Sequence, residues 1–156
     1  MAEALRLAAR GLFTTDPNPR VGCVIADDTG IIGRGWHDRA GGRHAEVAAL
    51  EDAGRPVRGH TAYVTLEPCN HHGRTPPCTE ALLQAGIARV VVASKDPNPG
   101  VTGGGLERLR EAGVDVQSGL LAAQSEALNC GFMKRARTGR PWVRVKCAIS
   151  LDGRTA

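Results

Sequence analysis

Residues 61–78 of the chain read TAYVTLEPCNHHGRTPPC, and this stretch decides how the rest of the chain can fold. Its first part, 61–66, is rich in β-branched and aromatic side chains, which predicts a strand. Cys69 comes just after that strand, and ligands bind at the carboxyl ends of strands in open α/β sheets. The Thr-Pro pair at 75–76 supplies an N-cap and a first-turn proline. We therefore expect a helix to begin there, with Cys78 near its start.

The segments on either side alternate between strand and helix patterns. Two β-rich runs, 21–26 and 31–37, are joined by a hairpin signal at 27–30. From residue 61 onward the order strand, helix, strand, helix implies right-handed crossovers and a largely parallel sheet. The fold class is therefore α/β, with three layers. The other expected elements are helices at 3–10, 44–53, 106–112 and about 121–137, and strands at 88–94 and 114–117.

Four side chains from two separate stretches form a candidate metal site. His44, Cys69 and Cys78 offer one imidazole and two thiols, a donor set that selects zinc and leaves the fourth tetrahedral position open for water. Zinc lowers the pKa of that water to roughly 7, so a hydroxide nucleophile is available at neutral pH. Glu46 follows His44 by two residues, so it can lie beside the metal without binding it. We expect its carboxylate to carry a proton from the water to the substrate, a contribution of about 10²–10⁴ in rate.

Other interpretations of these residues stay open on local sequence. A lone histidine at a helix start is more often a cap or a surface residue than a metal ligand, and only the downstream cysteines change that balance for His44. Eight residues separate the two cysteines, whereas a redox pair is typically separated by two. A structural zinc module is a further alternative, with His71 or His72 as a fourth ligand, because structural zinc sites are closed.

Composition limits the possible partners. The chain has 156 residues, of which 42% are hydrophobic, enough for the core of one compact domain, and no segment is long enough to cross a membrane. The net charge of +4 suits a phosphorylated small molecule, whereas 3% aromatic residues are too few for the stacking platforms of single-stranded nucleic-acid binders. The N-terminus has no signal-peptide pattern. We therefore expect a cytoplasmic protein with a small anionic substrate and no nucleic-acid or membrane partner.

Two proline-containing loops present polar side chains. Asn18 lies between two prolines, which hold it extended and able to offer its amide to a ligand. Asp96 and Asn98 follow the strand expected to end at Ser94, so they leave the sheet at a strand end. A turn in which these side chains bond to their own backbone is an equally good interpretation of each loop.

The candidate metal site resembles that of a known superfamily. The run His44-Ala45-Glu46, with Pro68-Cys69 and Cys78, resembles the zinc-dependent nucleoside and nucleobase deaminases. The spacing of the cysteines departs from the general pattern, since eight residues rather than two separate them. The fuller run 65–78 and the run DPNPRVGCV at 16–24 are similar to the pyrimidine deaminase domain of bifunctional riboflavin biosynthesis proteins, the diaminohydroxyphosphoribosylaminopyrimidine deaminases.

The resemblance implies a cytidine deaminase-like α/β/α sandwich around a mixed, largely parallel five-stranded sheet. It implies hydrolytic deamination of 2,5-diamino-6-ribosylamino-4(3H)-pyrimidinone 5′-phosphate in riboflavin biosynthesis, with release of ammonia; a deaminase of another nucleobase or of tRNA adenosine is the alternative. By carry-over to matching positions, His44, Cys69 and Cys78 hold Zn²⁺ and Glu46 is the catalytic proton carrier. The residues implied to bind the ring, ribose and phosphate are Asn18, His71, Arg74, Asp96 and Asn98, with Arg74 as the cation for the phosphate.

The last residues of the chain suggest a domain boundary. In this family a reductase domain that uses NADPH follows the deaminase, and residues 146–156, KCAISLDGRTA, are similar to the first strand and loop of that domain. We expect a deaminase domain at 1–140, followed at 141–156 by a linker and the first strand of a truncated reductase domain. Because one strand cannot build a cofactor site, we expect no reductase activity. We also expect a homo-oligomer, either a dimer or a tetramer.

Overall fold

A computed structural model describes residues 1–72, 76–98 and 104–155. It contains one five-stranded sheet with the strand order β2-β1-β3-β4-β5. The strands are β1 (Gly22–Asp27), β2 (Gly30–Trp36), β3 (Thr61–Leu66), β4 (Arg89–Ser94) and β5 (Asp115–Ser118). The helices are α1 (Ala2–Ala9), α2 (Ala45–Ala53), α3 (Cys78–Gln84), α4 (Gly105–Glu111), α5 (Ala122–Leu128) and α6 (Cys130–Thr138).

The pairing of the strands brings several chain segments to one edge of the sheet. β1 pairs antiparallel with β2 and with β3, whereas β3 with β4 and β4 with β5 are parallel, so the sheet is mixed. Gly22, at the start of β1, lies opposite Trp36 at the end of β2. Leu66 and Ser94 end β3 and β4 side by side. The segments that enter β1 and leave β2, β3 and β4 therefore meet at the same edge.

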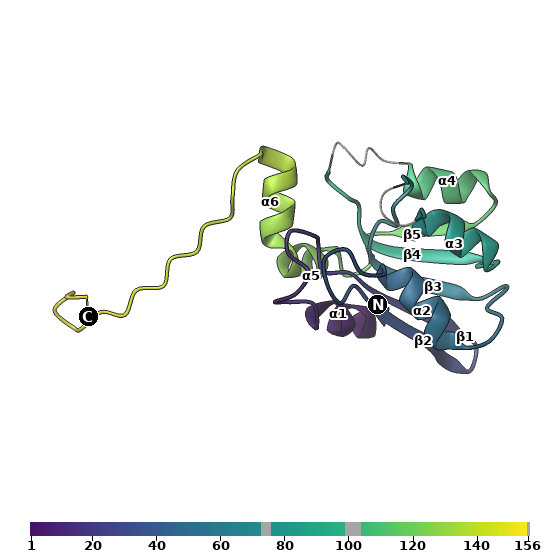
Figure 1. The fold of residues 1–156 in the computed structure, drawn as a ribbon, viewed down its shortest axis with the longest axis horizontal. Coiled ribbons are helices and arrows are strands. Elements are labelled where there is room, and N and C mark those ends of the chain that lie inside the picture. The colour runs from purple at the N-terminus through teal and green to yellow at the C-terminus, as the bar shows by residue number, and fades with distance from the viewer. Residues whose placement is uncertain (73–75, 99–103, 156) are drawn as a thin grey trace.

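Helices cover both faces of this sheet (Figure 1). α1 and α5 pack on one face, and α2, α3 and α4 form the layer on the other. Side chains alternate along β1 accordingly: Ile25 belongs to the larger apolar core under α2, α3 and α4, and Val24 packs with Leu7 of α1. The three layers confirm the predicted α/β/α sandwich.

Two glycines of β2 let α2 approach the sheet closely. A Cβ atom at Gly35 would lie 2.2 Å from the carbonyl oxygen of Ala45, and one at Gly33 would lie 2.4 Å from a carbonyl oxygen of the same helix. A larger residue at either position would push the helix away. The contact fixes the start of α2 against the end of the sheet, with His44 just before the helix and Glu46 in its first turn.

The stretch at about 121–137 is helical as expected, but it is divided into two helices. α5 ends at Leu128 and α6 begins at Cys130, and Asn129 between them has φ −110° and ψ 24°. Asn129 is only 1% exposed. Its Oδ1 accepts from the backbone N–H of Arg20 at 2.8 Å, and its Nδ2 donates to the carbonyl of Arg20 at 2.9 Å. The helix breaks where this side chain pairs with a distant backbone segment.

The start of α3 also differs from the expectation. The helix begins at Cys78, with Pro77 as its N-cap at φ −56° and ψ 136°, and not at 75–76. Pro76 precedes another proline, and the ring of that second proline disfavours helical backbone at the residue before it. The predicted position of Cys78 at a helix start is confirmed. Thr75 lies outside the described residues.

The chain leaves the body of the domain after α6. Residues 141–155 run outward as an extended segment, which ends in a turn closed by a bridge between Ile149 and Thr155 (Figure 1). Val145 and Leu151 on this segment are exposed. In the part of the chain that the structure describes, no helix combines the length and the apolar character needed to span a bilayer.

Candidate active site

The three predicted metal ligands meet at the sheet edge. His44 precedes α2, Cys69 follows β3, and Cys78 is the first residue of α3. His44 Nδ1 lies 3.1 Å from Cys78 Sγ and 3.5 Å from Cys69 Sγ, and all three donor atoms lie within 4.8 Å of one another. A tetrahedral zinc ion with bonds of about 2.0–2.3 Å holds nitrogen and sulfur donors about 3.5 Å apart. The donor set and its spacing therefore fit zinc.

A fourth protein ligand is absent from this group over residues 1–72, 76–98 and 104–155. His71 and His72, the residues that could have closed the site, are exposed and do not join the group. Three protein donors with one open position are typical of catalytic zinc sites, whereas structural sites are closed by four. Over those residues the geometry favours a catalytic site over a structural zinc module.

Hydrogen bonds among the three predicted metal ligands shift their pKa values. A hydrogen bond from Cys78 lowers the pKa of Cys69 well below its usual range, and the contact with His44 acts in the same direction. The hydrogen bond between the two sulfurs, together with burial, raises the pKa of Cys78, because Cys78 is the donor in that bond. The bond to Cys69 raises the pKa of His44 against the opposing effect of burial. These contacts favour the thiolate at Cys69, and the thiolate is the form of cysteine that binds metal.

Glu46 lies in the first turn of α2, beside these donors and outside their group. Its side chain is 3% exposed. Burial raises the pKa of Glu46 to about 6; the negative charge of Cys69 adds to this increase, and His44 opposes it. A carboxyl group with a pKa near neutrality can both accept and release a proton.

A cavity of about 310 Å³ opens at the metal-ligand group. His44, Glu46 and Cys69 line it, together with residues of the segments that flank the sheet edge and of α6. Four of the predicted substrate-binding residues also line it: Asn18, His71, Asp96 and Asn98. The fifth, Arg74, lies outside the described residues.

His37 is a cavity residue that the sequence analysis missed. It follows β2 directly and is 4% exposed. Its Nδ1 lies 2.9 Å from the carbonyl oxygen of Arg43, which can only accept, so Nδ1 carries a proton. In the neutral ring Nε2 then accepts from the side-chain amide of Asn18 at 3.1 Å. This bond uses the Nδ2 of Asn18 and does not involve its carbonyl oxygen. The sequence did contain a signal for His37, because this residue lies at the end of a predicted strand. Cys69 was singled out by the same criterion, that ligands bind at strand ends.

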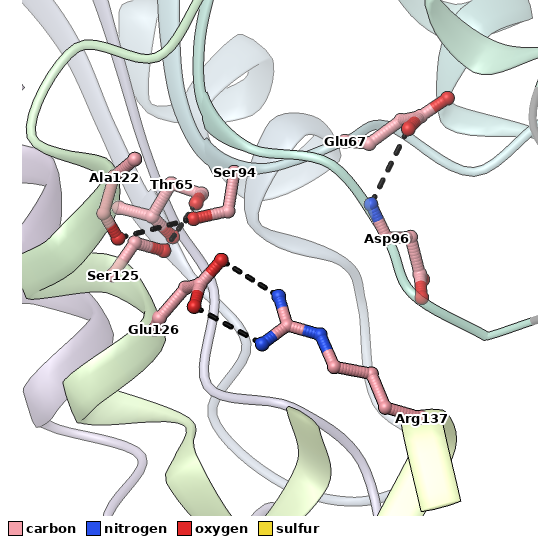
Figure 2. A network of polar contacts seen from close by, with 8 residues as sticks. All are labelled: Thr65, Glu67, Ser94, Asp96, Ala122, Ser125, Glu126 and Arg137. Atoms are coloured by element: carbon pink, nitrogen blue, oxygen red, sulfur yellow. Dashed lines mark hydrogen bonds and ion pairs between the residues drawn. The ribbon is translucent and has the colours of Figure 1, made fainter. Parts of the chain in front are cut away.

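Glu67, which leads from β3 to Cys69, is a second cavity residue that the sequence analysis missed. Its Oε2 accepts from the backbone N–H of Asp96 at 3.3 Å (Figure 2). Asp96 Oδ1 in turn accepts from the backbone N–H of Asn98 at 2.8 Å, so the turn interpretation of this loop and its place at the cavity both hold. The pKa of Asp96 is raised, and burial of its carboxyl group is the largest cause.

The fold and the donor set together define a class, the zinc-binding deaminases. The family model for the cytidine and deoxycytidylate deaminase zinc-binding region matches residues 1–94, which contain His44, Glu46, Cys69 and Cys78. The match supports zinc as the metal of this donor set.

Individual relatives narrow the class. The riboflavin biosynthesis protein RibD of Escherichia coli strain K12 is 62% identical over 156 residues, which are 100% of this chain and 42% of that protein. A diaminohydroxyphosphoribosylamino-pyrimidine deaminase of Buchnera aphidicola subsp. Schizaphis graminum is 52% identical over 141 residues, or 90% of this chain and 96% of the relative. The solved structure of Acinetobacter baumannii RibD matches with a TM-score of 0.95 and 55% identity, over 99% of this chain and 44% of that one.

The chain thus spans less than half the length of these RibD proteins and nearly the whole length of the Buchnera deaminase. It belongs to the cytidine and deoxycytidylate deaminase family, in the branch of the diaminohydroxyphosphoribosylaminopyrimidine deaminases.

Proposed function

We propose that the chain catalyses hydrolytic deamination of 2,5-diamino-6-ribosylamino-4(3H)-pyrimidinone 5′-phosphate in riboflavin biosynthesis. The bond between C2 and its amino group breaks, a water oxygen takes its place, and ammonia and 5-amino-6-ribosylamino-pyrimidinedione 5′-phosphate leave. The observation that carries the proposal is the meeting of three zinc-type donors with a buried carboxylate beside one cavity, which His44, Glu46 and Cys69 line. The name of the Buchnera relative, whose length the chain nearly covers, supports the choice of substrate.

We assign His44 Nδ1 and the sulfurs of Cys69 and Cys78 to Zn²⁺, because their spacing and chemistry fit that ion. Zinc held by these residues would supply a water activated at neutral pH. The Glu46 carboxylate would take one proton from the attacking water and pass it to a ring nitrogen, and would then take the proton of the new hydroxyl on C2 and pass it to the departing amine. Its burial keeps bulk water from competing for the proton.

The remaining cavity residues hold the substrate. Asn18, fixed by His37, presents its carbonyl oxygen to a ring N–H or amino group. Asp96 and Asn98 face the cavity from the neighbouring strand end, and His71 lines it from the loop after Cys69. Arg74 supplies the positive charge for the phosphate.

We also propose that residues 1–140 form the deaminase unit and that 141–156 lead out of it. The extended course of the segment after α6 supports this boundary (Figure 1).

We predict a homo-oligomer, either a dimer or a tetramer. Sedimentation across a range of concentrations tests this prediction, and a monomer at every concentration would contradict it. The cytoplasmic location also remains a prediction.

The proposed function is tested by ammonia release from the zinc-loaded chain with a panel of substrates. The panel holds the diaminopyrimidine phosphate, its dephosphorylated form, cytidine, deoxycytidylate and a tRNA stem-loop with a target adenosine. We expect turnover of the diaminopyrimidine phosphate and little of the others. Turnover of another base alone would establish the alternative substrate class, and zinc binding without any ammonia release would support a structural module.

A further inference from the structure

Glu67 joins two neighbouring strand ends and α4. Its backbone N–H donates to the carbonyl of Ser94 at 2.9 Å. Its Oε2 accepts from the N–H of Asp96 and its Oε1 from the N–H of Leu106, both at 3.3 Å. Figure 2 shows the carboxylate reaching across to the Asp96 backbone on the adjacent segment. Asp96 and Leu106 flank the connection from β4 to α4, so one carboxylate ties both ends of that connection.

The packing of α4 holds this carboxylate in place. A Cβ atom at Gly105 would lie 2.1 Å from the carbonyl oxygen of Pro68 and 3.2 Å from Oε1 of Glu67. Glycine at this position therefore lets the first turn of α4 rest directly on the loop that leads to Cys69. The N–H of Leu106 belongs to that first turn, where a helix supplies no acceptor of its own, so Glu67 satisfies it.

We propose that Glu67 is a positioning residue for the substrate, one that fixes the loop of Asp96 and Asn98 relative to the ligand Cys69. Glu67 lies two residues before the metal ligand Cys69, and its side chain accepts from the backbone N–H of Asp96. It therefore connects the segment that carries the metal ligand to the loop that contacts the substrate. Both of its oxygens accept backbone N–H groups, a role distinct from the proton transfer assigned to Glu46. The inference rests on the proposed function, because that function makes the Asp96 loop a substrate contact.

The variant Glu67→Gln tests this role. It keeps the size of the side chain and one acceptor oxygen, but it turns an amide group toward one of the two backbone N–H groups. We expect the KM for the diaminopyrimidine phosphate to rise about tenfold while kcat stays within about threefold, because the loop holds the ground state and the transition state alike. The zinc content stays at one ion per chain.

Glu80→Gln is a matched control. Glu80 also fastens α4, because Arg108 donates to its Oε1, with the guanidinium 2.9 Å away, but this ion pair leads to α3 and not to the Asp96 loop. We expect an unchanged KM in this variant. A rise in KM equal to that of Glu67→Gln would show that loosening α4 is enough and would overturn the positioning role.

Amide hydrogen exchange provides a readout that does not depend on turnover. In Glu67→Gln the backbone amide that loses its acceptor, that of Asp96 or that of Leu106, should exchange faster than in the wild type, and in Glu80→Gln neither should. If the wild type releases no ammonia from this compound, faster exchange at that amide still supports the anchoring by Glu67, while the proposed function fails. Unchanged exchange, unchanged KM in an active enzyme, or loss of zinc from Glu67→Gln would each overturn the inference.

Discussion

Replacing Glu46 by glutamine separates proton transfer from metal binding. Glutamine has nearly the same volume, so it fills the same buried space, and none of the three metal donors is changed. Because the side chain is only 3% exposed, bulk water cannot take over its role. The loss should therefore reach the full range for general acid–base catalysis, about 10²–10⁴ in kcat, or roughly 3–5 kcal/mol of activation free energy.

The assay for this variant combines steady-state ammonia release with zinc analysis and thermal unfolding. We expect one zinc per chain and a midpoint of unfolding no lower than that of the wild type, because the variant no longer buries a charge. Glu51→Gln is the control: Glu51 lies on the same helix but is exposed and paired with Arg43, so kcat should not change. Loss of zinc from Glu46→Gln would make Glu46 a ligand, and a loss of kcat below about fivefold would refute its role as proton carrier.

Three further changes test the helix break, the phosphate contact and the metal. Asn129→Asp removes the donor to the Arg20 carbonyl and should lower the free energy of unfolding by about 1–3 kcal/mol in urea titrations; a change below about 0.5 kcal/mol would contradict the pairing. Arg74→Ala should raise the KM for the phosphorylated substrate and leave its dephosphorylated form unaffected, whereas equal wild-type affinity for the two compounds would contradict a phosphate role. Chelation of the metal should lower the midpoint of thermal unfolding, and added zinc should restore it; a midpoint indifferent to zinc would argue against binding to the folded state.

Local sequence patterns were sufficient for most of the secondary structure. The strand predicted at 61–66 has those bounds in the structure, and the helix predicted at 44–53 begins one residue later, after His44. Such elements follow from β-branched runs and apolar periodicity, which act between near neighbours. The break at Asn129 could not be predicted in this way, because its cause is a pair of hydrogen bonds to Arg20, 109 residues away.

In the candidate site, too, some residues could be predicted from local sequence and others could not. His44, Cys69 and Cys78 could be grouped from sequence, because zinc needs these donor types and because strand ends converge at one sheet edge. His37 and Glu67 were missed because their roles lie in bonds to other parts of the chain: His37 orients an amide from the loop before β1, and Glu67 holds backbone N–H groups beyond β4. Residue type alone carries no sign of such bonds.

The central claim is one zinc ion on three protein donors with an open fourth position. X-ray absorption at the zinc edge of the purified chain tests it most directly. We predict one zinc per chain, with two sulfur neighbours at about 2.3 Å and two nitrogen or oxygen neighbours at about 2.0–2.1 Å, one of which exchanges with added anions. A third sulfur, a second histidine nitrogen or a chain that binds no zinc would contradict the account.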